Sequence, residues 1–302
     1  MESDSLRLFV LAAEQLNISA AGRALGMAPA VASARLAKLE KTLGAELLHR
    51  STRKVALSLD GAEFLPYARE ILAQESAARA ALGLESAVAT GTLRFAAPST
   101  FAHLYIAPLL PEFLARHPGI SLDLRLSDTP FDLIEGSFDL ALRNAALSDS
   151  SLKARKLADD RRILCASPDY LDRHGTPRDP AELATHQLVG FRDPSPKRLI
   201  GPDGTTAQFD PRQAGCRLVV DDGLSQKVAT TAGAGISMNS LWSVHREIAD
   251  GALVRVLPAY EIDDRTALWL IYPQSNVLTA KVRTFIDFLL DKIGRSPVWE
   301  GV

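Results

Sequence analysis

A very short gap between two helical patterns near the start of the chain limits the folds that it can adopt. Apolar spacing predicts a short helix over residues 20–25 with Ser19 as its N-cap, and Gly26 stands where a helix ends in the left-handed conformation. Only three residues separate it from a second helix that begins at Pro29, a position where the missing N–H of proline costs nothing. Two helices joined by so tight a turn form a helix-turn-helix, and a preceding helical pattern over residues 6–16 can pack against them.

The second of these helices has an unusual outer face. Its buried stripe consists of Ala32, Leu36, Leu39 and Leu43, and the residues opposite are Ala30, Ala34, Ala37, Lys38 and Lys41. Small side chains allow a helix backbone to approach another surface closely, and the width of the DNA major groove admits one helix. The pattern therefore favours insertion into a major groove, with packing against another helix as the alternative.

A basic hairpin follows the helices. Two short apolar strands within residues 46–58 flank a tip that contains Arg50, Thr52, Arg53 and Lys54. Residues 23–54 hold seven Lys or Arg and two Asp or Glu, although the whole chain has a formal net charge of −2. A local excess of cations is expected where a protein meets an anionic partner. We interpret the hairpin as a wing whose cations meet phosphates or a minor groove.

The N-terminal region resembles that of the LysR-type transcriptional regulators. The matching motifs are Leu6-x-x-Phe9, Ala20-Ala21 before Leu25-Gly26, Ser33, Leu39-Glu40-x-x-Leu43-Gly44, Leu47-Leu48-x-Arg50 and Ser58-x-x-Gly61. The resemblance implies a winged helix-turn-helix that binds double-stranded DNA. Ala28 departs from the family's usual polar cap, and Ala34 stands where an Arg is usual, with Arg35 following. The candidate DNA-binding residues are Pro29, Ala30, Ser33, Ala34, Arg35, Lys38, Arg50, Thr52 and Arg53.

A long helical pattern connects this head to the rest of the chain. Its apolar residues are Phe64, Ala68, Ile71, Leu72, Ala78, Ala81 and Leu82, and Pro66 is expected to kink its start. An apolar stripe without a neighbour needs a partner helix, and in the LysR-type family this helix pairs antiparallel with its copy. The resemblance therefore implies a homodimer or homotetramer on an interrupted inverted repeat, with packing on the chain's own effector domain as the alternative. We expect a DNA-binding domain over residues 1–60, a linker over 61–90 and an effector-binding domain over 91–302.

Strand and helix patterns alternate from residue 92 onward, which is typical of an α/β fold with mostly parallel sheets. Two successive series predict lobe I over about residues 91–162 and 267–302, and lobe II over about residues 163–266. The LysR-type effector domain has this two-lobe fold, like periplasmic binding proteins, with a small-molecule effector in the cleft. The expected fold class is α/β with an all-α-like N-terminal domain: a winged helix-turn-helix, a long linker helix and a two-lobe effector domain.

The effector site is expected at the carboxyl ends of the strands, where helix N-termini point in open α/β sheets. The first such turn covers residues 98–101, and its hydroxyls and free N–H groups suit a carboxylate or another anion. The candidate effector-binding residues are Ser99, Thr100, Phe101, Thr129, Arg143, Phe191, Arg192 and Asp222, with Asp128, Met238 and Asn239 nearby. They favour a small anionic effector with Phe101 and Phe191 as apolar walls.

We find no pattern for catalysis, a cofactor or a metal site. Gly233-Ala234-Gly235 follows a helical pattern rather than a strand, so the context of a dinucleotide-binding loop is missing. The six histidines show no metal-ligand spacing. Cys165 and Cys216 lie 51 positions apart, which favours buried thiols over a redox pair. The alternative to a regulator is a small-molecule binding protein or metabolic enzyme with an incidental N-terminal helical domain.

The sequence also favours a cytoplasmic protein without a membrane partner. Its start, Met1-Glu2-Ser3-Asp4, lacks the basic region of a signal peptide. Its apolar runs are shorter than the roughly 18 residues that cross a bilayer. RNA polymerase is a further partner that the resemblance implies.

Overall fold

A computed structural model describes residues 2–50, 55–81, 89–128, 138–145, 152–192, 196–212, 216–264, 266–273 and 278–301. The chain divides into two compact units, one built mainly from Met1–Ala89 and the other mainly from Thr90–Gln274 and Lys281–Val302. We call the first unit the head and the second the effector domain. Each is described separately below.

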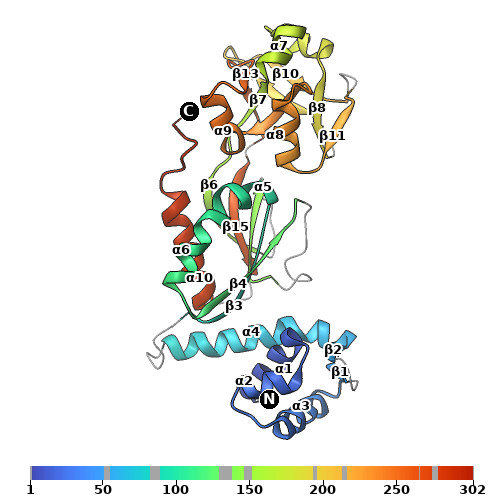
Figure 1. Cartoon of the computed structure of the whole chain (residues 1–302), viewed down its shortest axis with the longest axis vertical. Coiled ribbons are helices and arrows are strands. Elements are labelled where there is room, and N and C mark those ends of the chain that lie inside the picture. The colour runs from blue at the N-terminus through green and yellow to red at the C-terminus, as the bar shows by residue number, and fades with distance from the viewer. Residues whose placement is uncertain are drawn as a thin grey trace. The chain divides into compact units, whose positions relative to one another are not determined.

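The head contains the predicted helix-turn-helix (Figure 1). Its elements are α1 Ser3–Gln15, α2 Ile18–Ala24, α3 Pro29–Leu43, β1 Leu48–Arg50, β2 Val55–Leu57 and α4 Leu59–Ala81. Gly26 has a φ of +69°, so it makes the turn between α2 and α3 in the left-handed region, as expected. The α2 cap differs from our prediction: Asn17 accepts the Ala20 N–H at 2.9 Å, and Ser19 lies within the helix.

One face of α4 completes the core of the head. Leu65 and Ala68 are buried in that core, and Phe64 and Leu72 pack against it. The Phe64 ring lies 5.8 Å from the Phe9 ring of α1. The head therefore buries Ala68 completely and covers Phe64 and Leu72 in part, so the predicted stripe is not left whole for a partner helix. Ile71 is 38% exposed; Leu82 lies outside the described residues.

Lobe I of the effector domain is built on a five-stranded sheet in the order β4-β3-β5-β15-β6. Its strands are β3 Gly91–Ala97, β4 Ile120–Leu126, β5 Leu140–Ala145, β6 Leu152–Asp159 and β15 Ala267–Pro273. A helical path leaves β3 as α5 Ser99–Phe101, a π-helical turn Ala102–Ile106, a 3-10 turn Ala107–Leu109 and α6 Leu110–Arg116. Helix α10, Ala280–Leu289, lies beside α6 in Figure 1 and continues as a π-helical turn Leu290–Gly294. The ring centroid of Phe285 on α10 lies 5.1 Å from that of Phe95 on β3 and 4.8 Å from that of Phe113 on α6. These contacts fix α6 and α10 on the sheet.

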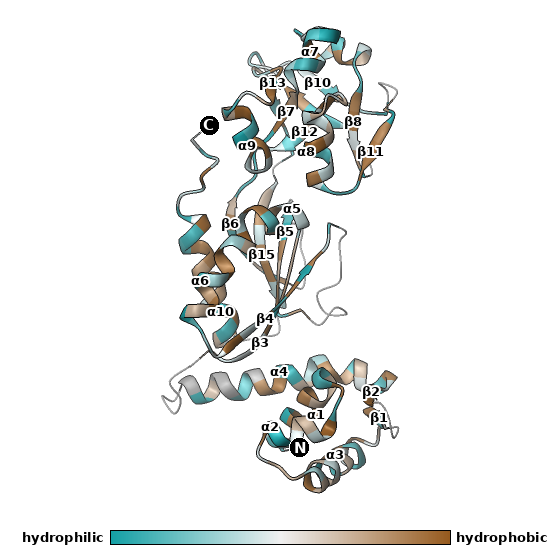
Figure 2. Ribbon diagram, in the orientation of Figure 1, coloured by the Kyte–Doolittle hydropathy of each residue, from teal (hydrophilic) through white to brown (hydrophobic). Residues whose placement is uncertain are grey.

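Lobe II has a five-stranded sheet in the order β11-β8-β12-β7-β13 and a three-stranded sheet in the order β10-β9-β14. The strands of the larger sheet are β7 Arg162–Ala166, β8 Leu188–Phe191, β11 Leu218–Val220, β12 Ile236–Ser240 and β13 Val254–Val256. The smaller sheet contains β9 Lys197–Ile200, β10 Thr206–Phe209 and β14 Glu261–Ile262. The helices are α7 Pro168–His174, a 3-10 helix Pro180–Thr185, α8 Gly223–Thr231 and α9 Leu241–Ala249. Strand β11, largely brown in Figure 2, forms an apolar edge of the sheet.

The expectation of mostly parallel sheets is wrong. In lobe I, β3 pairs in parallel with β4 and β5, whereas β15 pairs antiparallel with β5 and β6. In lobe II, β8 pairs in parallel with β11 and β12, and β7 pairs antiparallel with β12 and β13. The physical reason in lobe I is the path of the chain. It leaves after β6 and returns as β15, which enters the sheet in the opposite direction to β5.

Candidate functional site

The exposed face of α3 carries small side chains at the start of the helix. Pro29, Ala30 and Ala34 are exposed, and Ser33 is half-buried. Val31, which the sequence analysis did not select, is 53% exposed. Ala28 has extended backbone geometry at the N-cap and no side-chain capping bond. This end of α3 therefore leaves its backbone open to close approach.

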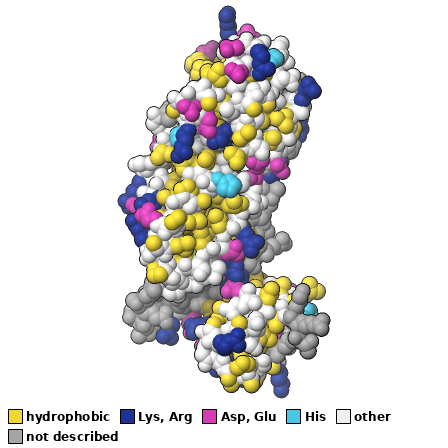
Figure 3. Space-filling view, viewed as in Figure 1, with side chains coloured by type: hydrophobic (Ala, Val, Ile, Leu, Met, Phe, Trp, Pro, Cys, Tyr) yellow, Lys and Arg dark blue, Asp and Glu magenta, His cyan; other side chains and the backbone are white. Residues whose placement is uncertain are grey.

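The cationic candidates on α3 already have acidic neighbours. Arg35 Nη1 lies 3.3 Å from Asp4 Oδ2, and Lys38 Nζ lies 3.0 Å from Glu2 Oε1. Lys and Arg side chains project from the head amid largely white and yellow surface in Figure 3. The α3 face thus combines an apolar beginning with cations one to two turns further along.

One carboxylate of α3 joins this helix to the wing by accepting hydrogen bonds from two backbone N–H groups. Glu40 Oε1 accepts the Leu47 and Leu48 N–H groups at 3.0 and 3.1 Å, and β1 then pairs antiparallel with β2. Gly61 packs so closely that a Cβ there would lie 1.9 Å from the Leu47 carbonyl oxygen. Arg50 ends β1, while Thr52 and Arg53 lie outside the described residues. The motif residues Glu40, Leu47 and Gly61 therefore position the wing.

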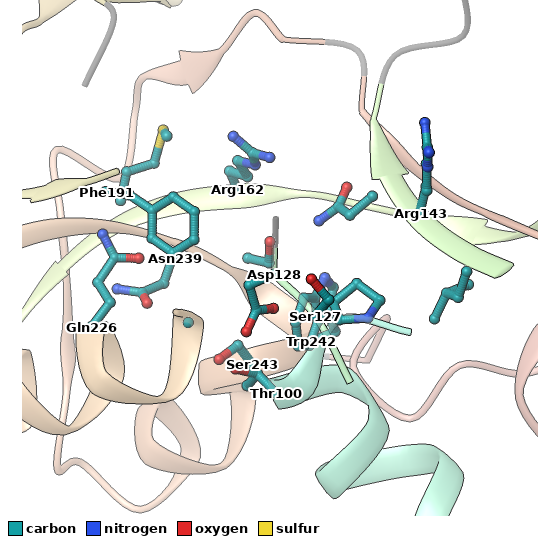
Figure 4. A pocket seen from close by; sticks show the side chains of 16 residues that line it. Thr100, Ser127, Asp128, Arg143, Arg162, Phe191, Gln226, Asn239, Trp242 and Ser243 are labelled. Carbon is teal, nitrogen blue, oxygen red and sulfur yellow. The ribbon is translucent and has the colours of Figure 1, made fainter. Parts of the chain in front are cut away.

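A cavity of about 310 Å³ lies between the two lobes of the effector domain. Lobe I contributes Pro98, Thr100, Ser127, Asp128, Leu142, Arg143 and Asn144, and lobe II contributes Arg162, Phe191, Gly223, Gln226, Met238, Asn239, Ser240, Trp242 and Ser243. Figure 4 shows Thr100, Asp128 and Ser243 gathered near the middle of the view, Phe191 and Asn239 to one side, and Arg143 extending away from them. The size is that of a site for a small molecule.

The structure brings some of the predicted effector residues to this cavity and places others behind it. Thr100, Arg143 and Phe191 line it. The remaining described candidates are Ser99, Phe101, Arg192 and Asp222, none of which is in the lining. Thr129 lies outside the described residues.

The four candidates outside the lining have structural partners. The Ser99 N–H donates to Asp128 Oδ1 at 3.0 Å, and its hydroxyl donates to Asp128 Oδ2. Phe101 is fully buried, with its ring centroid 5.1 Å from that of Trp242. Arg192 Nη2 donates to the Asp221 carbonyl oxygen at 3.0 Å. Asp222 caps α8 by accepting the Ser225 N–H at 2.9 Å, and this hydrogen bonding holds the pKa of Asp222 below its ordinary value.

Several lining residues escaped the sequence analysis. Trp242 and Ser243 belong to the first turn of α9, a helix that it did not predict. Asn144, Arg162 and Gln226 also escaped it. The rule applied to residues 98–101 would also select the first turn of α9, which begins directly after β12, but it needs a predicted start of that helix, and the sequence marks none.

Arg162 is held by buried acids where the chain crosses between the lobes. Its Nε lies 3.2 Å from Asp160 Oδ2, and its Nη1 lies 3.0 Å from Asp264 Oδ2. Asp160 Oδ2 also accepts from Asn144 Nδ2 and Thr266 Oγ1, both at 2.9 Å. Two carboxylates therefore already balance the charge of Arg162.

Four lining residues have buried polar atoms without a hydrogen-bond partner among the described residues. The atoms are Thr100 Oγ1, Asn144 Oδ1, Trp242 Nε1 and Ser243 Oγ. Buried polar groups are usually paired, and an unpaired one costs about 1–3 kcal/mol. A bound molecule that supplies the missing partners would recover part of that cost.

The described residues contain no group of three or more His, Cys, Asp or Glu arranged for a metal ion. Burial raises the pKa of the Cys165 thiol to about 11, which disfavours the reactive thiolate. The Cys216 thiol donates to the Leu218 carbonyl oxygen at 3.0 Å. Among the described helices, none is long and apolar enough to cross a membrane.

Two family models match successive parts of the chain. Residues 3–62 match the bacterial regulatory helix-turn-helix protein of the lysR family, and residues 86–294 match the LysR substrate binding domain. The chain belongs to the LysR family of transcriptional regulators. The alternative of a binding protein or enzyme with an incidental helical domain is wrong, because both parts of the chain match this family.

Similar LysR-family proteins span nearly the whole chain. It is 33% identical over 294 residues to the HTH-type transcriptional regulator CrgA of Neisseria meningitidis serogroup C (strain 8013), covering 97% of this chain and 98% of the relative. It is 32% identical over 288 residues to the transcriptional activator AaeR of Escherichia coli (strain K12), covering 95% and 92%.

Solved structures of full-length relatives agree with this LysR-family assignment. The structure of CrgA from Neisseria meningitidis matches with a TM-score of 0.62 and 32% identity, covering 98% of this chain and 100% of that one. The Vibrio cholerae virulence activator AphB matches with a TM-score of 0.60 and 28% identity, covering 96% and 99%. The protein is thus a DNA-binding transcriptional regulator with an effector-binding domain.

Proposed function

We propose that this LysR-family regulator binds an interrupted inverted repeat as a homodimer or homotetramer and responds to a small anionic effector held between its two lobes. The match of both family models is the observation that carries the proposal. A regulator of this kind acts on the bacterial chromosome in the cytoplasm, and we include RNA polymerase among its proposed partners.

The proposed DNA contacts fall into two groups. Pro29, Ala30, Ser33 and Ala34 would meet base edges, because small apolar groups can contact thymine methyls and a serine hydroxyl can bond to a base or phosphate. The proposed phosphate contacts are Arg35, Lys38, Arg50, Thr52 and Arg53. The exposed start of α3 supports the first group.

Exposed apolar side chains support self-association. On α4, Tyr67 and Ile71 are 59% and 38% exposed beside a face that the head covers. On lobe II, the edge strand β11 and helix α8 expose Val219 and Val228, at 50% and 58%. Contiguous apolar surface of this kind marks protein contacts. We assign α4 to the dimer and the effector domains to a further step toward tetramers.

The anionic effector is supported by the donor groups around the cavity. Trp242 Nε1 can only donate a hydrogen bond, and the Thr100 and Ser243 hydroxyls can both donate. Arg143 is a cation of the same lining that extends away from Thr100 and Ser243, and Phe191 supplies an apolar wall. Asp128 is a carboxylate in the same lining, but its two oxygens already accept from Ser99. An acid of small size fits this distribution best.

Thermal-shift screening tests the effector class. We would compare small carboxylic acids with the neutral amides of the same acids on the full chain, and expect stabilisation by an acid but not by its amide. Thr100→Val should remove the response, and Ser99→Ala should weaken it through Asp128, with basal DNA binding unchanged. Thr231→Val is the matched control, because its hydroxyl donates to the Lys227 carbonyl oxygen outside the lining. Stabilisation by neutral or cationic compounds alone would exclude an anion site.

A further inference from the structure

A chain of alternating charges runs across the head from α4 to α3. Its members, in order, are Glu75 on α4, Arg7 and Asp4 on α1, Arg35 on α3, Glu2 before α1, and Lys38 on α3. The N···O distances between successive members are 3.1, 3.5, 3.3, 3.9 and 3.0 Å. The two acids in contact with α3, Glu2 and Asp4, are called the acidic clamp below.

The acidic clamp binds the cations of α3 that lie beyond its small-residue start. Lys38 donates to Glu2 Oε1 at 3.0 Å, and Arg35 Nη1 donates to Asp4 Oδ2 at 3.3 Å. The hydrogen bond from Lys38 Nζ, and then the charge of Lys38, lower the pKa of the Glu2 carboxyl below its ordinary value. Glu2 is therefore ionised at neutral pH, and both carboxyl groups of the clamp contact cations of α3.

Arg7 pairs more closely with Glu75 than with Asp4. Its Nη2 lies 3.1 Å from Glu75 Oε2, whereas its Nη1 reaches Asp4 Oδ1 at 3.5 Å. The closer carboxylate of Arg7 is thus on α4, and the second oxygen of Asp4 is directed to Arg35. Asp4 consequently stays beside α3 instead of pairing with Arg7 alone.

We propose that the acidic clamp competes with DNA phosphates for Lys38 and Arg35 and so lowers the affinity of the head for all DNA sequences. This inference rests on the proposed placement of Arg35 and Lys38 at phosphates. Lys38 and Arg35 each have further N–H donors, but a side chain shared by a carboxylate and a phosphate brings these two negative groups close together. Their repulsion weakens the contact with the clamp when the head binds DNA. The clamp carboxylates and Lys38 are exposed, at 57% and 72%, so the exchange needs no unfolding.

The competition has two measurable consequences. Removing both clamp charges should tighten DNA binding about two- to tenfold, the range expected for two exposed ion pairs. In the wild-type protein, the displaced carboxylates take up counterions and offset part of the counterion release from DNA. Without them, the plot of log K against log salt should become steeper by up to about one unit.

The experiment compares the full chain with its Glu2→Gln/Asp4→Asn variant on random-sequence double-stranded DNA, between about 50 and 200 mM salt. Any purification tag should follow Val302, so that nothing precedes Met1. Glu14→Gln is a matched control, because Glu14 is also an acid of α1 but pairs with Arg69 on α4, at 3.2 Å. Circular dichroism of each variant checks that the head stays folded.

Tighter binding and a steeper slope in the clamp variant, with Glu14→Gln like the wild type, support the clamp. The clamp variant removes two negative charges and Glu14→Gln removes one. A gain in binding free energy for Glu14→Gln that is half that of the clamp variant or more would therefore trace the effect to net charge and overturn the proposal. Unchanged or weaker binding in a folded clamp variant would also overturn the proposal. The two acids would then have no effect on DNA binding, or would hold Arg35 and Lys38 where they reach the phosphates. If the wild-type chain binds no DNA, the proposed phosphate contacts fail together with the clamp; if it binds and the variant does not differ, only the clamp fails.

Discussion

Gly223 at the start of α8 lies so close to the Thr100 side chain of lobe I that a Cβ at position 223 would sit 3.0 Å from Thr100 Oγ1. Thr100 is 2% exposed and therefore has little room to move. The φ of Gly223 is not in the left-handed region, so the constraint at this position is space: an added Cβ would require Thr100 to shift by a few tenths of an ångström. The two lobes thus meet beside the cavity through a contact that leaves little room for a side chain at position 223.

Gly223→Val should hold the lobes apart and lower the melting temperature of the full chain. Overpacking of a buried contact costs about 1–3 kcal/mol. The Thr100→Ala change should relieve part of this cost, so the double variant should be more stable than the sum of the two single effects predicts. Thermal denaturation of all four chains measures this coupling. Strictly additive effects would mean that the two side chains do not meet.

Ala34→Glu should abolish DNA binding without unfolding the head. Ala34 is exposed on α3, and a carboxylate there would face phosphates, a like-charge contact that costs several kcal/mol. We expect affinity to fall by at least about a hundredfold in a gel-shift or anisotropy assay. Ala34→Ser keeps the side chain small and uncharged, and should retain most of the affinity. Normal binding by Ala34→Glu would place α3 outside the groove.

Two substitutions on α4 should separate assembly from head stability. Ile71 is 38% exposed, so Ile71→Glu should yield a smaller species in sedimentation with an unchanged melting temperature of the head. Phe64 packs on the core of the head, so Phe64→Ala should cost about 2–3 kcal/mol, below the 3–5 typical of a fully buried ring. Phe64→Ala should leave the oligomeric mass unchanged. The same mass for Ile71→Glu and the wild type would place the dimer contact elsewhere.

The sequence predicted the helix ends that depend on a single residue at the boundary. Gly26 and Pro29 mark the two ends of the tight turn. Gly26 adopts the left-handed conformation, which glycine tolerates well, and Pro29 occupies the first position of α3, where its missing N–H costs nothing. Asn17 and Ser19 show the limit of such reasoning: both can cap a helix, and the structure uses Asn17 because α2 begins one residue earlier than Ser19, at Ile18. The choice between two adequate caps depends on how the helix packs, which the pattern does not record.

Long-range partners account for the other differences. The apolar spacing of α4 shows that Phe64 and Ala68 are buried, but it does not show that α1 rather than a second chain covers them. Similarly, α9 follows β12 without a Gly or Pro between them, so the sequence showed no boundary before Trp242 and Ser243. Strand direction in each sheet depends on where the chain crosses between lobes, and alternation of strands and helices carries no information about that. The cavity could be located by strand ends, while Asn144, Arg162, Gln226, Trp242 and Ser243 of its lining could not.

His186 should make the stability of lobe II depend on pH below about 6.5. It is 5% exposed, and its Nδ1 lies 3.2 Å from the hydroxyl of Tyr170, which accepts the Gln187 N–H at 2.8 Å. Burial, and then the neighbouring His174, lower the pKa of His186 from its ordinary value of 6.5. Protons therefore bind the unfolded chain more readily, and the free energy of unfolding should fall as pH drops from about 6.5 through the folded pKa, by at most ~1.4 kcal/mol per pH unit.

Denaturation of the full chain at pH 7.5 and at about pH 5.5 measures the effect. His186→Asn keeps an acceptor for Tyr170 and should flatten the dependence, whereas His103→Asn, at an exposed position, should not. An equally steep dependence in His186→Asn would assign the titration to other groups.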